Sequence, residues 1–286
     1  MKLSIREKKV TRSAGGDTIV FILLVIGGTF MALPMVYTIS QAFKPMNELF
    51  IWPPRFFVRN PTMANFYDLF LLMEDSWVPI TRYLFNTLVI TAFGTCGHVL
   101  MASLAAYALA KHKFPGRGVY FNIIVFSLMF AWHVTAIPNY LIMSHIGWVD
   151  TYLAIVAPAW AMPLGLYLMK QFMEQIPNPL LEAARIDGAG EFKIFWSIVM
   201  PNVKPAWLTL IILSFQSMWG ETGARFIYTE ELKPLPYALN QIVSGGIARA
   251  GTGAAVTVLM MLIPIIIFII NQSKVVQTMG SAGIDK

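Results

Sequence analysis

The segment from Pro177 to Pro205 holds the residues whose types and spacing could support molecular recognition. It is polar and charged, yet apolar stretches flank it on both sides. The carboxylate of Glu182 can pair with a basic partner, and the small side chains of Ala183 and Ala184 allow another surface to approach closely. We therefore expect a docking element; the alternative is an amphipathic loop that lies on a membrane surface.

Two short helices joined at a glycine should present these residues. Asn178 is expected to cap the first helix through its side chain, with Pro179 at the first helical position, where a missing N–H costs nothing. Gly188 should end that helix, because glycine readily adopts the left-handed conformation required there. Two pairs of residues one turn apart are predicted to share a face: Leu180 with Ala184, and Leu181 with Arg185.

A second helix is predicted after Gly190 and is expected to end at Pro201. Helical spacing predicts one apolar stripe along it, made by Phe192, Phe195, Trp196 and Val199.

Other side chains offer little catalytic chemistry. His98 and His133 fall in apolar stretches, and no paired His or Cys at metal spacing accompanies them. We expect each to be hydrogen-bonded within a helix bundle; a proton relay or a metal ligand is the alternative. Cys96 is the single cysteine, which excludes a disulfide framework. The phosphate loop G-x-x-x-x-G-K-[ST] is missing from the sequence, so we expect no catalytic residue, no cofactor and no metal in this chain.

The composition indicates a membrane protein. Of the 286 residues, 57% are hydrophobic and 13% are charged, whereas soluble domains carry about a quarter charged residues. The net charge of +6 lies in short segments between apolar stretches, which favours membrane topology over nucleic-acid binding. Residues 18–36 form a run long enough to span a bilayer, and we interpret it as a retained first helix rather than a cleaved signal peptide.

Six spans are predicted, and positive charge orients them. Most of the 21 Lys and Arg residues fall on one side when the N-terminus is cytoplasmic, which also places both termini and the segment around Glu182 inside. The predicted organisation is a cytoplasmic segment 1–17, a six-helix membrane domain 18–272 that contains the loop 177–205, and a cytoplasmic tail 273–286. The spans are expected at about 18–41, 84–109, 119–142, 152–170, 206–220 and 254–272.

The spans suggest how the bundle packs and what drives it. Their interiors hold no Asp, Glu, Lys or Arg, which argues against a proton- or sodium-coupled carrier. Ala102, Ala106 and Ala110 recur every four residues and predict a small face that another helix can approach. Three prolines are expected to kink their spans: Pro158, Pro163 and Pro264.

The segment 177–205 also matches a family pattern of Glu-Ala-Ala, three residues, Gly, nine residues, Ile, one residue and Leu-Pro. Met200 replaces the pattern's leucine, and Gly190 stands where Ser or Thr is usual. On these residues the chain resembles the membrane-spanning permease subunits of bacterial ATP-binding-cassette importers, in the carbohydrate-uptake branch of the maltose-transporter G-subunit type. The matching residues are Glu182, Ala183, Ala184, Gly188, Ile198 and Pro201.

Shorter matches extend the resemblance over nearly the whole chain. They are Asn86-Thr87, residues 105–110 with Phe114-Pro115-Gly116-Arg117, Ile137-Pro138 with Tyr140-Leu141, Leu235-Pro236 and Val276-Gln277. Trp219-Gly220-Glu221 departs from the usual Trp-Asn-Glu, and the ending SAGIDK lacks the usual Ala-Val-Lys-Gly.

The resemblance implies an all-α type I importer permease fold with a coupling helix between spans 4 and 5. It implies a bacterial inner-membrane location, a second permease subunit, two cytoplasmic ATPase subunits that bind ATP and magnesium in place of this chain, an extracytoplasmic solute-binding protein, a sugar substrate, membrane lipid and no nucleic acid. The residues that it implies for coupling to the ATPase are Glu182, Ala183, Ala184, Asp187, Gly188, Ile198 and Pro201.

Candidates for the substrate pathway are Asn139, Trp219 and Glu221, because aromatic faces and hydrogen bonds hold sugars. Helix packing or capping is the alternative role of these three residues. The external loop 227–253 could reach into the binding protein, or it could be a flexible connector. The rival functions are a permease for a non-sugar solute, an ion-coupled secondary carrier and an integral-membrane enzyme.

Overall fold

The computed structural model describes residues 14–74, 77–246 and 249–282 of the chain. Every regular element within these ranges is a helix, and none is a strand, which confirms the all-α prediction. The chain divides into two compact units, one of residues 1–69 with 247–258 and one of residues 70–246 with 259–286. Much of the predicted segment 1–17 and the end of the predicted tail 273–286 lie outside the described residues.

The first unit contains α1 (Ala14–Ala42), the short α2 (Met46–Leu49), the start of α3 (Ala64–Glu74) and the start of α14 (Ala250–Ala282). Most side chains of α1 are exposed and apolar, as expected for a helix whose solvent is lipid. After α1 the carboxylate of Glu48 accepts hydrogen bonds from the backbone N–H groups of Arg59 and Asn60, each at 3.0 Å. These bonds lower the pKa of Glu48 and fix the loop that follows α1.

Within the described residues, four helical stretches are long and apolar enough to cross a membrane: Gly15–Ala42, Ile80–Lys111, Leu153–Glu174 and Ala250–Asn271. A fifth is added if Glu191–Asn202 and Lys204–Trp219, which meet at an angle of 81°, count as one broken span. Five of the six predicted spans therefore correspond to helices of the described chain.

The predicted span 119–142 is not one helix. The chain forms α5 (Arg117–Ser127) and α6 (Trp132–His145), with residues 128–131 between them. Bonds from Leu128 N to Val125 O and from Met129 N to Phe126 O close the end of α5, and Ala131 then adopts an extended conformation. None of the residues in this break is proline or glycine, so the apolar pattern gave no signal for it.

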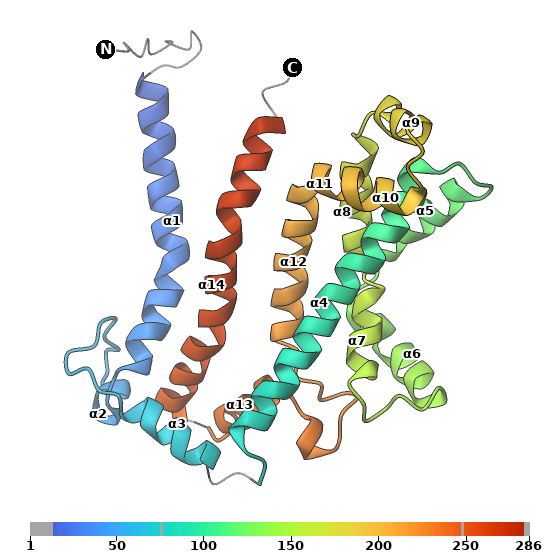
Figure 1. Cartoon of the computed structure of the whole chain (residues 1–286). Helices are drawn as coiled ribbons and strands as arrows, with labels where there is room; N and C mark the ends of the chain where they lie inside the picture. The colour runs from blue at the N-terminus through green and yellow to red at the C-terminus, as the bar shows by residue number, and fades with distance from the viewer. Residues whose placement is uncertain (1–13, 75–76, 247–248, 283–286) are drawn as a thin grey trace. The chain divides into compact units, whose positions relative to one another are not determined.

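The second unit is built around α4 (Ile80–Lys111), which packs against α7 (Leu153–Trp160), α8 (Pro163–Glu174) and α12 (Lys204–Trp219) (Figure 1). Ala102 and Ala106 are 3% and 0% exposed in the core shared with α8 and α12, so the predicted small-residue face is confirmed for these two. The break between α7 and α8 directly precedes Pro163, which begins α8. Proline suits the first position of a helix because the N–H that it lacks would have no partner there.

The two ends of α4 meet different parts of the second unit (Figure 1). Near its C-terminal end lie α9 (Asn178–Ile186) and α10 (Glu191–Ile194), and near its N-terminal end lies α13 (Leu235–Val243). The segment that carries the predicted docking residues is thus positioned at one end of the bundle's central helix.

Candidate functional sites

Helix α9 starts differently from the prediction. Its N-cap residue is Pro177, without a capping side chain, and Asn178 is already helical, so the prediction that Asn178 caps the helix is wrong. Asn178 instead accepts a hydrogen bond through Oδ1 from Lys111 Nζ at 3.3 Å. The same ammonium donates to Ile176 O at 2.6 Å, so the C-terminal end of α4 holds the start of α9.

The end of α9 confirms the predicted glycine stop. Gly188 has φ of +80°, and its N–H donates to Arg185 O at 3.0 Å, while the N–H of Ala189 donates to Ala184 O at 2.9 Å. These two bonds form a Schellman motif, which satisfies carbonyls at the end of the helix. Asp187 is the exposed C-cap residue just before the glycine.

One face of α9 is rooted in the core, and the other is exposed. Leu181 and Ala184 are 2% and 9% exposed and belong to the hydrophobic core that also contains residues of α4 and α8. Glu182 and Ala183 are exposed. Leu180 is 44% exposed, so of the predicted pair Leu180 and Ala184 only Ala184 is buried, together with Leu181.

The exposed face of α9 and α10 is partly apolar. Ile186 is 86% exposed and Phe192 is 75% exposed, although both belong to a segment rich in charge. Exposed large apolar side chains close to one another mark a contact surface for a partner or a membrane. Together with Glu182, Ala183 and Leu180, these residues form the exposed face of α9 and α10.

The second predicted helix is not uniform. It consists of α10, a π-helical turn at Phe195–Val199 and α11 (Met200–Asn202). The π turn brings residues five apart onto one side, so Ile194 and Val199 are both 0% exposed. The predicted apolar stripe is therefore wrong in part: Phe195 and Val199 are buried, whereas Phe192 and Trp196 are exposed.

The remaining coupling candidates lie in this second part. Ile198 is partly buried against the core that roots α9, and Pro201 is exposed within α11. The helix ends at Asn202, one residue beyond the predicted stop at Pro201, and Asn202 Nδ2 donates to Ile198 O at 2.7 Å.

Glu191 is a connecting residue that the sequence analysis missed. Its carboxylate accepts a hydrogen bond from Arg185 Nε at 2.8 Å and one from the Tyr107 hydroxyl at 2.7 Å, and His112 Nε2 lies 3.5 Å away. The bond from Arg185, followed by the bond from Tyr107, holds the pKa of Glu191 below its usual range. An acidic residue directly after Gly190, in the first turn of a helix, was the available signal.

A second candidate site is a cavity of about 790 Å³ in the second unit. Asn139 and Glu221, two of the three predicted pathway residues, line it. Trp219 does not line it: its side chain is 2% exposed, its Nε1 donates to Met260 O at 3.0 Å, and its ring stacks on Phe215, as in the helix-packing alternative. Trp219 thus packs against α14 instead of contributing an aromatic surface to the cavity.

The cavity's polar lining comes from Thr135 and Asn139, one turn apart on α6, from the end of α12, and from the chain just after α12. Arg225, which the sequence analysis did not single out, approaches Glu221 to 4.0 Å. Glu221 Oε1 also accepts a hydrogen bond from Gly223 N at 3.1 Å. The polar residues that line the cavity are Ser127, Thr135, Asn139, Ser217, Glu221, Thr222 and Arg225.

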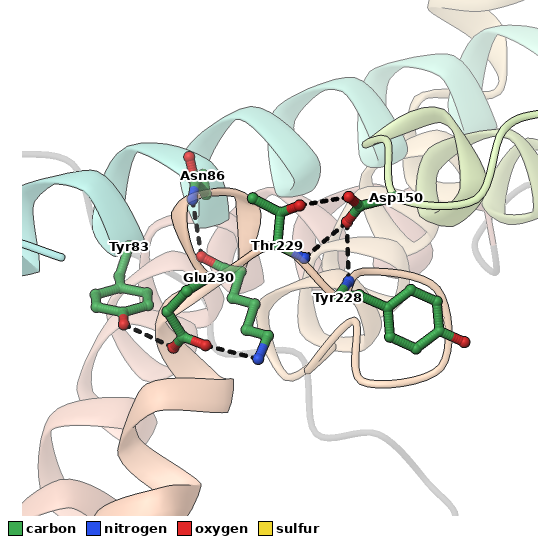
Figure 2. Close-up of polar contacts among 7 residues, drawn as sticks. Tyr83, Asn86, Asp150, Tyr228, Thr229 and Glu230 are labelled. Atoms are coloured by element: carbon green, nitrogen blue, oxygen red, sulfur yellow. Dashed lines mark hydrogen bonds and ion pairs between the residues drawn. The ribbon is translucent and has the colours of Figure 1, made fainter. Parts of the chain in front are cut away.

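A hydrogen-bonded cluster anchors the chain that follows this cavity (Figure 2). Asp150, with a left-handed φ of 64°, donates its N–H to Phe226 O at 2.7 Å. Its carboxylate accepts bonds from the N–H groups of Tyr228 and Thr229, both at 2.9 Å, and from the Thr229 hydroxyl. The bonds from Thr229 lower the pKa of Asp150.

The same cluster ties the loop to the N-terminal end of α4 (Figure 2). Asn86, one residue of the Asn-Thr match, donates from Nδ2 to Lys233 O at 2.8 Å. The Tyr83 hydroxyl donates to Glu230 at 2.8 Å, and Glu230 accepts a further bond from Lys233 at 2.6 Å. The chain that follows the cavity lining is therefore held to α4 by contacts distant in sequence, which no local pattern predicts.

The two histidines have different surroundings. His98 is 3% exposed, with Nδ1 2.6 Å from Ser214 Oγ and Nε2 3.2 Å from Met162 O, which matches the predicted hydrogen-bonded histidine of a bundle. His133 is exposed on α6. Among the described residues no group of three or more His, Cys, Asp or Glu side chains is arranged to hold a metal ion.

Comparison with known proteins gives consistent similarities. Residues 98–278 match the family described as binding-protein-dependent transport system inner membrane component. The chain is 28% identical to the sn-glycerol-3-phosphate transport system permease protein UgpE of Yersinia enterocolitica, over 72% of this chain and 74% of UgpE. It is 29% identical to the arabinooligosaccharides transport system permease protein AraQ of Halalkalibacterium halodurans, over 69% of this chain and 72% of AraQ.

One solved structure has a similar fold. A chain of a bacterial ABC transporter involved in the import of the acidic polysaccharide alginate aligns with a TM-score of 0.75 and 23% identity, over 92% of this chain and 98% of that chain. This likeness supports the helical arrangement described above.

Proposed function

The chain belongs to the family of binding-protein-dependent transport system inner membrane components, and on this premise we propose that it is the permease subunit of an ATP-driven importer of sugars or oligosaccharides. It forms half of the translocation pathway, and a second, related permease subunit forms the other half. An extracytoplasmic binding protein delivers the solute, and two cytoplasmic ATPase subunits supply the energy.

The observation that carries this proposal is the two-sided construction of α9. Its outer side presents Glu182 and Ala183, and its inner side, through Leu181 and Ala184, is part of the core shared with α4 and α8. A partner that moves the exposed side therefore moves residues packed into the bundle, because close-packed interiors transmit displacement. This construction suits a coupling helix better than a loop that only connects two spans.

The exposed side has the chemistry of a helix that docks in a groove. Apolar anchors such as Ile186 and Phe192 can fill a cleft, while Glu182 can pair with a basic residue at its edge. In this proposal ATP and magnesium are bound by the ATPase, and closure of that partner displaces α9 and switches the bundle between inward- and outward-facing states.

The proposed topology has six spans, with both termini cytoplasmic. In it, α5 and α6 together form the third span, and α12 forms the fifth, while the helix before α12 stays in the cytoplasmic loop. Support comes from the distribution of Lys and Arg, which places α9 inside and the loop around Asp150 outside. Breaks within spans are acceptable where neighbouring helices satisfy the freed backbone groups.

The proposal of a sugar substrate is supported by AraQ, whose name refers to arabinooligosaccharides. A permease for a non-sugar solute is the second candidate, because the UgpE relative is named for sn-glycerol 3-phosphate. An ion-coupled secondary carrier is disfavoured by spans whose interiors lack acidic and basic residues.

Cysteine cross-linking tests the docking. Cys96 is exposed, so it is first replaced by serine, and Ala183→Cys is then introduced in the complete transporter. We expect a cross-link from position 183 to a cysteine in the cleft of the ATPase, and none from the matched control Ala184→Cys, whose side chain is buried. Failure of position 183 to capture the ATPase, together with its labelling by a lipid-soluble reagent, would support the membrane-surface alternative and contradict the proposal.

A further inference from the structure

The cavity of about 790 Å³ is lined by two side chains of opposite charge, Glu221 and Arg225. Arg225 Nη2 lies 4.0 Å from Glu221 Oε2. Glu221 is held in place by its bond from Gly223 N at 3.1 Å, and Arg225 extends over the Phe226 ring, with Cζ 5.6 Å from the ring centroid. The cavity therefore contains one cation and one anion, paired and positioned before any solute is present.

Around this pair the lining offers neutral hydrogen-bonding groups. Thr135 and Asn139 lie four residues apart on α6, Ser217 lies near the end of α12, and Glu221 follows the C-cap residue of α12. Groups spaced by four residues face the same direction from a helix. Asn139 contributes an amide to the lining, and an amide supplies both donors and acceptors.

Apolar surface completes the lining. Phe130, which also lines the cavity, is 50% exposed, and Phe226 stacks on Tyr140 with ring centroids 6.3 Å apart. A site of mainly apolar surface with a few placed polar groups is typical of small-ligand pockets, whose volumes are roughly 300–1,000 Å³. Paired hydroxyl and amide groups beside an aromatic ring complement a polyhydroxylated solute.

We propose that this cavity binds a unit of a neutral saccharide during transport, and that the Glu221–Arg225 pair keeps the cavity electrically balanced and so disfavours acidic saccharides. This inference rests on the proposed function and specifies its substrate class. To bind an acidic solute, the cavity would need a basic side chain whose charge is not already balanced. Here the charge of Arg225 is already paired with that of Glu221. A carboxylate brought beside the pair would meet the negative charge of Glu221 at close range, which selects against it.

If the Glu221–Arg225 pair acts through its net charge, removing one charge should impair transport more than removing both. Glu221→Gln leaves the cavity with one net positive charge, and Arg225→Gln leaves it with one net negative charge. The double variant restores neutrality with groups of similar size. If balance is what matters, each single change lowers uptake of a neutral saccharide roughly ten-fold or more, and the double variant recovers most of the loss.

The experiment uses the complete transporter in proteoliposomes with its binding protein, both permease subunits and the ATPase. The probes are neutral arabino- and xylo-oligosaccharides and acidic alginate oligosaccharides of matched length. Glu231→Gln is the control, because this carboxylate lies on the same external loop, is exposed and does not line the cavity. It should transport as the parent does.

Uptake of neutral probes without acidic ones, and recovery in the double variant, is the expected result. Uptake of alginate oligosaccharides by the parent overturns the inference but leaves the saccharide importer intact. A double variant as poor as the singles, or single variants equal to the parent, also overturns it, because balance would then not control transport. Uptake of neither class of saccharide contradicts the proposed function itself.

Discussion

The hydroxyl of Tyr107 donates a hydrogen bond of 2.7 Å to Glu191, so the C-terminal end of α4 is tied to the first turn after the glycine hinge. Glu191 also accepts from Arg185, which precedes the hinge, at 2.8 Å. One carboxylate therefore connects both sides of Gly188 to the central helix of the bundle. A displacement of α9 cannot occur independently of α4 while these bonds persist.

The lowered pKa of Glu191 predicts how residues 178–194 respond to acid. Because the folded pKa of Glu191 is lowered from its ordinary value of 4.5, its contribution to stability is present above pH 4.5 and is lost as the pH falls through the lowered pKa. Hydrogen-exchange protection of residues 178–194, corrected for intrinsic rates, should stay constant down to about pH 4.5 and then decline.

Glu191→Gln is the comparison for this acid response. It should lower protection at neutral pH and flatten the profile, because Arg185 and Tyr107 then face a neutral amide and the remaining neighbour is His112. A variant with an acid profile identical to the parent's would show that another group controls the transition.

Charge reversal at Glu182 should uncouple transport while leaving the bundle intact. Glu182 is exposed, so Glu182→Lys leaves the core unchanged, whereas a basic partner would repel it. We expect uptake to fall by roughly ten-fold to a hundred-fold, the loss that accompanies removal of a charge-assisted bond of about 1.5–3 kcal/mol. Uptake is measured in proteoliposomes at equal amounts of inserted protein; unchanged uptake would argue against docking through this face.

The glycine hinge should show a conformational cost that is separate from packing. At Gly188 an added Cβ meets nothing within 4 Å, but φ is +80°, so Gly188→Ala should destabilise the segment by about 1–2 kcal/mol through backbone strain. Gly190→Ala is the matched control, because its φ is −70° and its surroundings are equally open. Thermal unfolding in detergent should show loss for the first variant and little change for the second; equal behaviour of the two would contradict the explanation.

Gly165 should be sensitive for the opposite reason, which is lack of space. A Cβ there would lie 2.3 Å from His98 Nε2 and 2.9 Å from Leu210 Cδ1, so the imidazole would have to leave Met162 O and Ser214. Gly165→Ala is expected to destabilise the protein by about 2–3 kcal/mol. Gly118→Ala in α5, with nothing within 4 Å, is the control and should be neutral or stabilising in the same unfolding measurement.

Local chemistry made part of this architecture predictable. Gly188 follows a helical run, and its lack of a Cβ suits the left-handed conformation of a Schellman motif, so its conformation could be predicted from its type and position. The small residues Ala102 and Ala106 likewise predicted where a helix packs closely against α4. In both cases neighbours in sequence determine the outcome.

Other features depend on contacts that the sequence does not display. The break at residues 128–131 contains neither proline nor glycine, and the π turn at Phe195–Val199 consists of ordinary helix-compatible residues. Trp219 was a candidate for the substrate pathway because of its aromatic face, but its side chain packs against α14, which its residue type alone does not reveal. Arg225 was missed because its relation to the cavity depends on the loop that Asp150 anchors.

The π turn has a mechanical consequence for the orientation of α9. A regular α-helix advances about 100° per residue, so one residue fewer within 195–199 would rotate everything before it by about that angle relative to α12. Leu181 and Ala184 could not follow such a rotation without leaving the core. The extra residue therefore sets how α9 is rotated relative to the bundle. The number of residues in this segment is thus as constrained as their types.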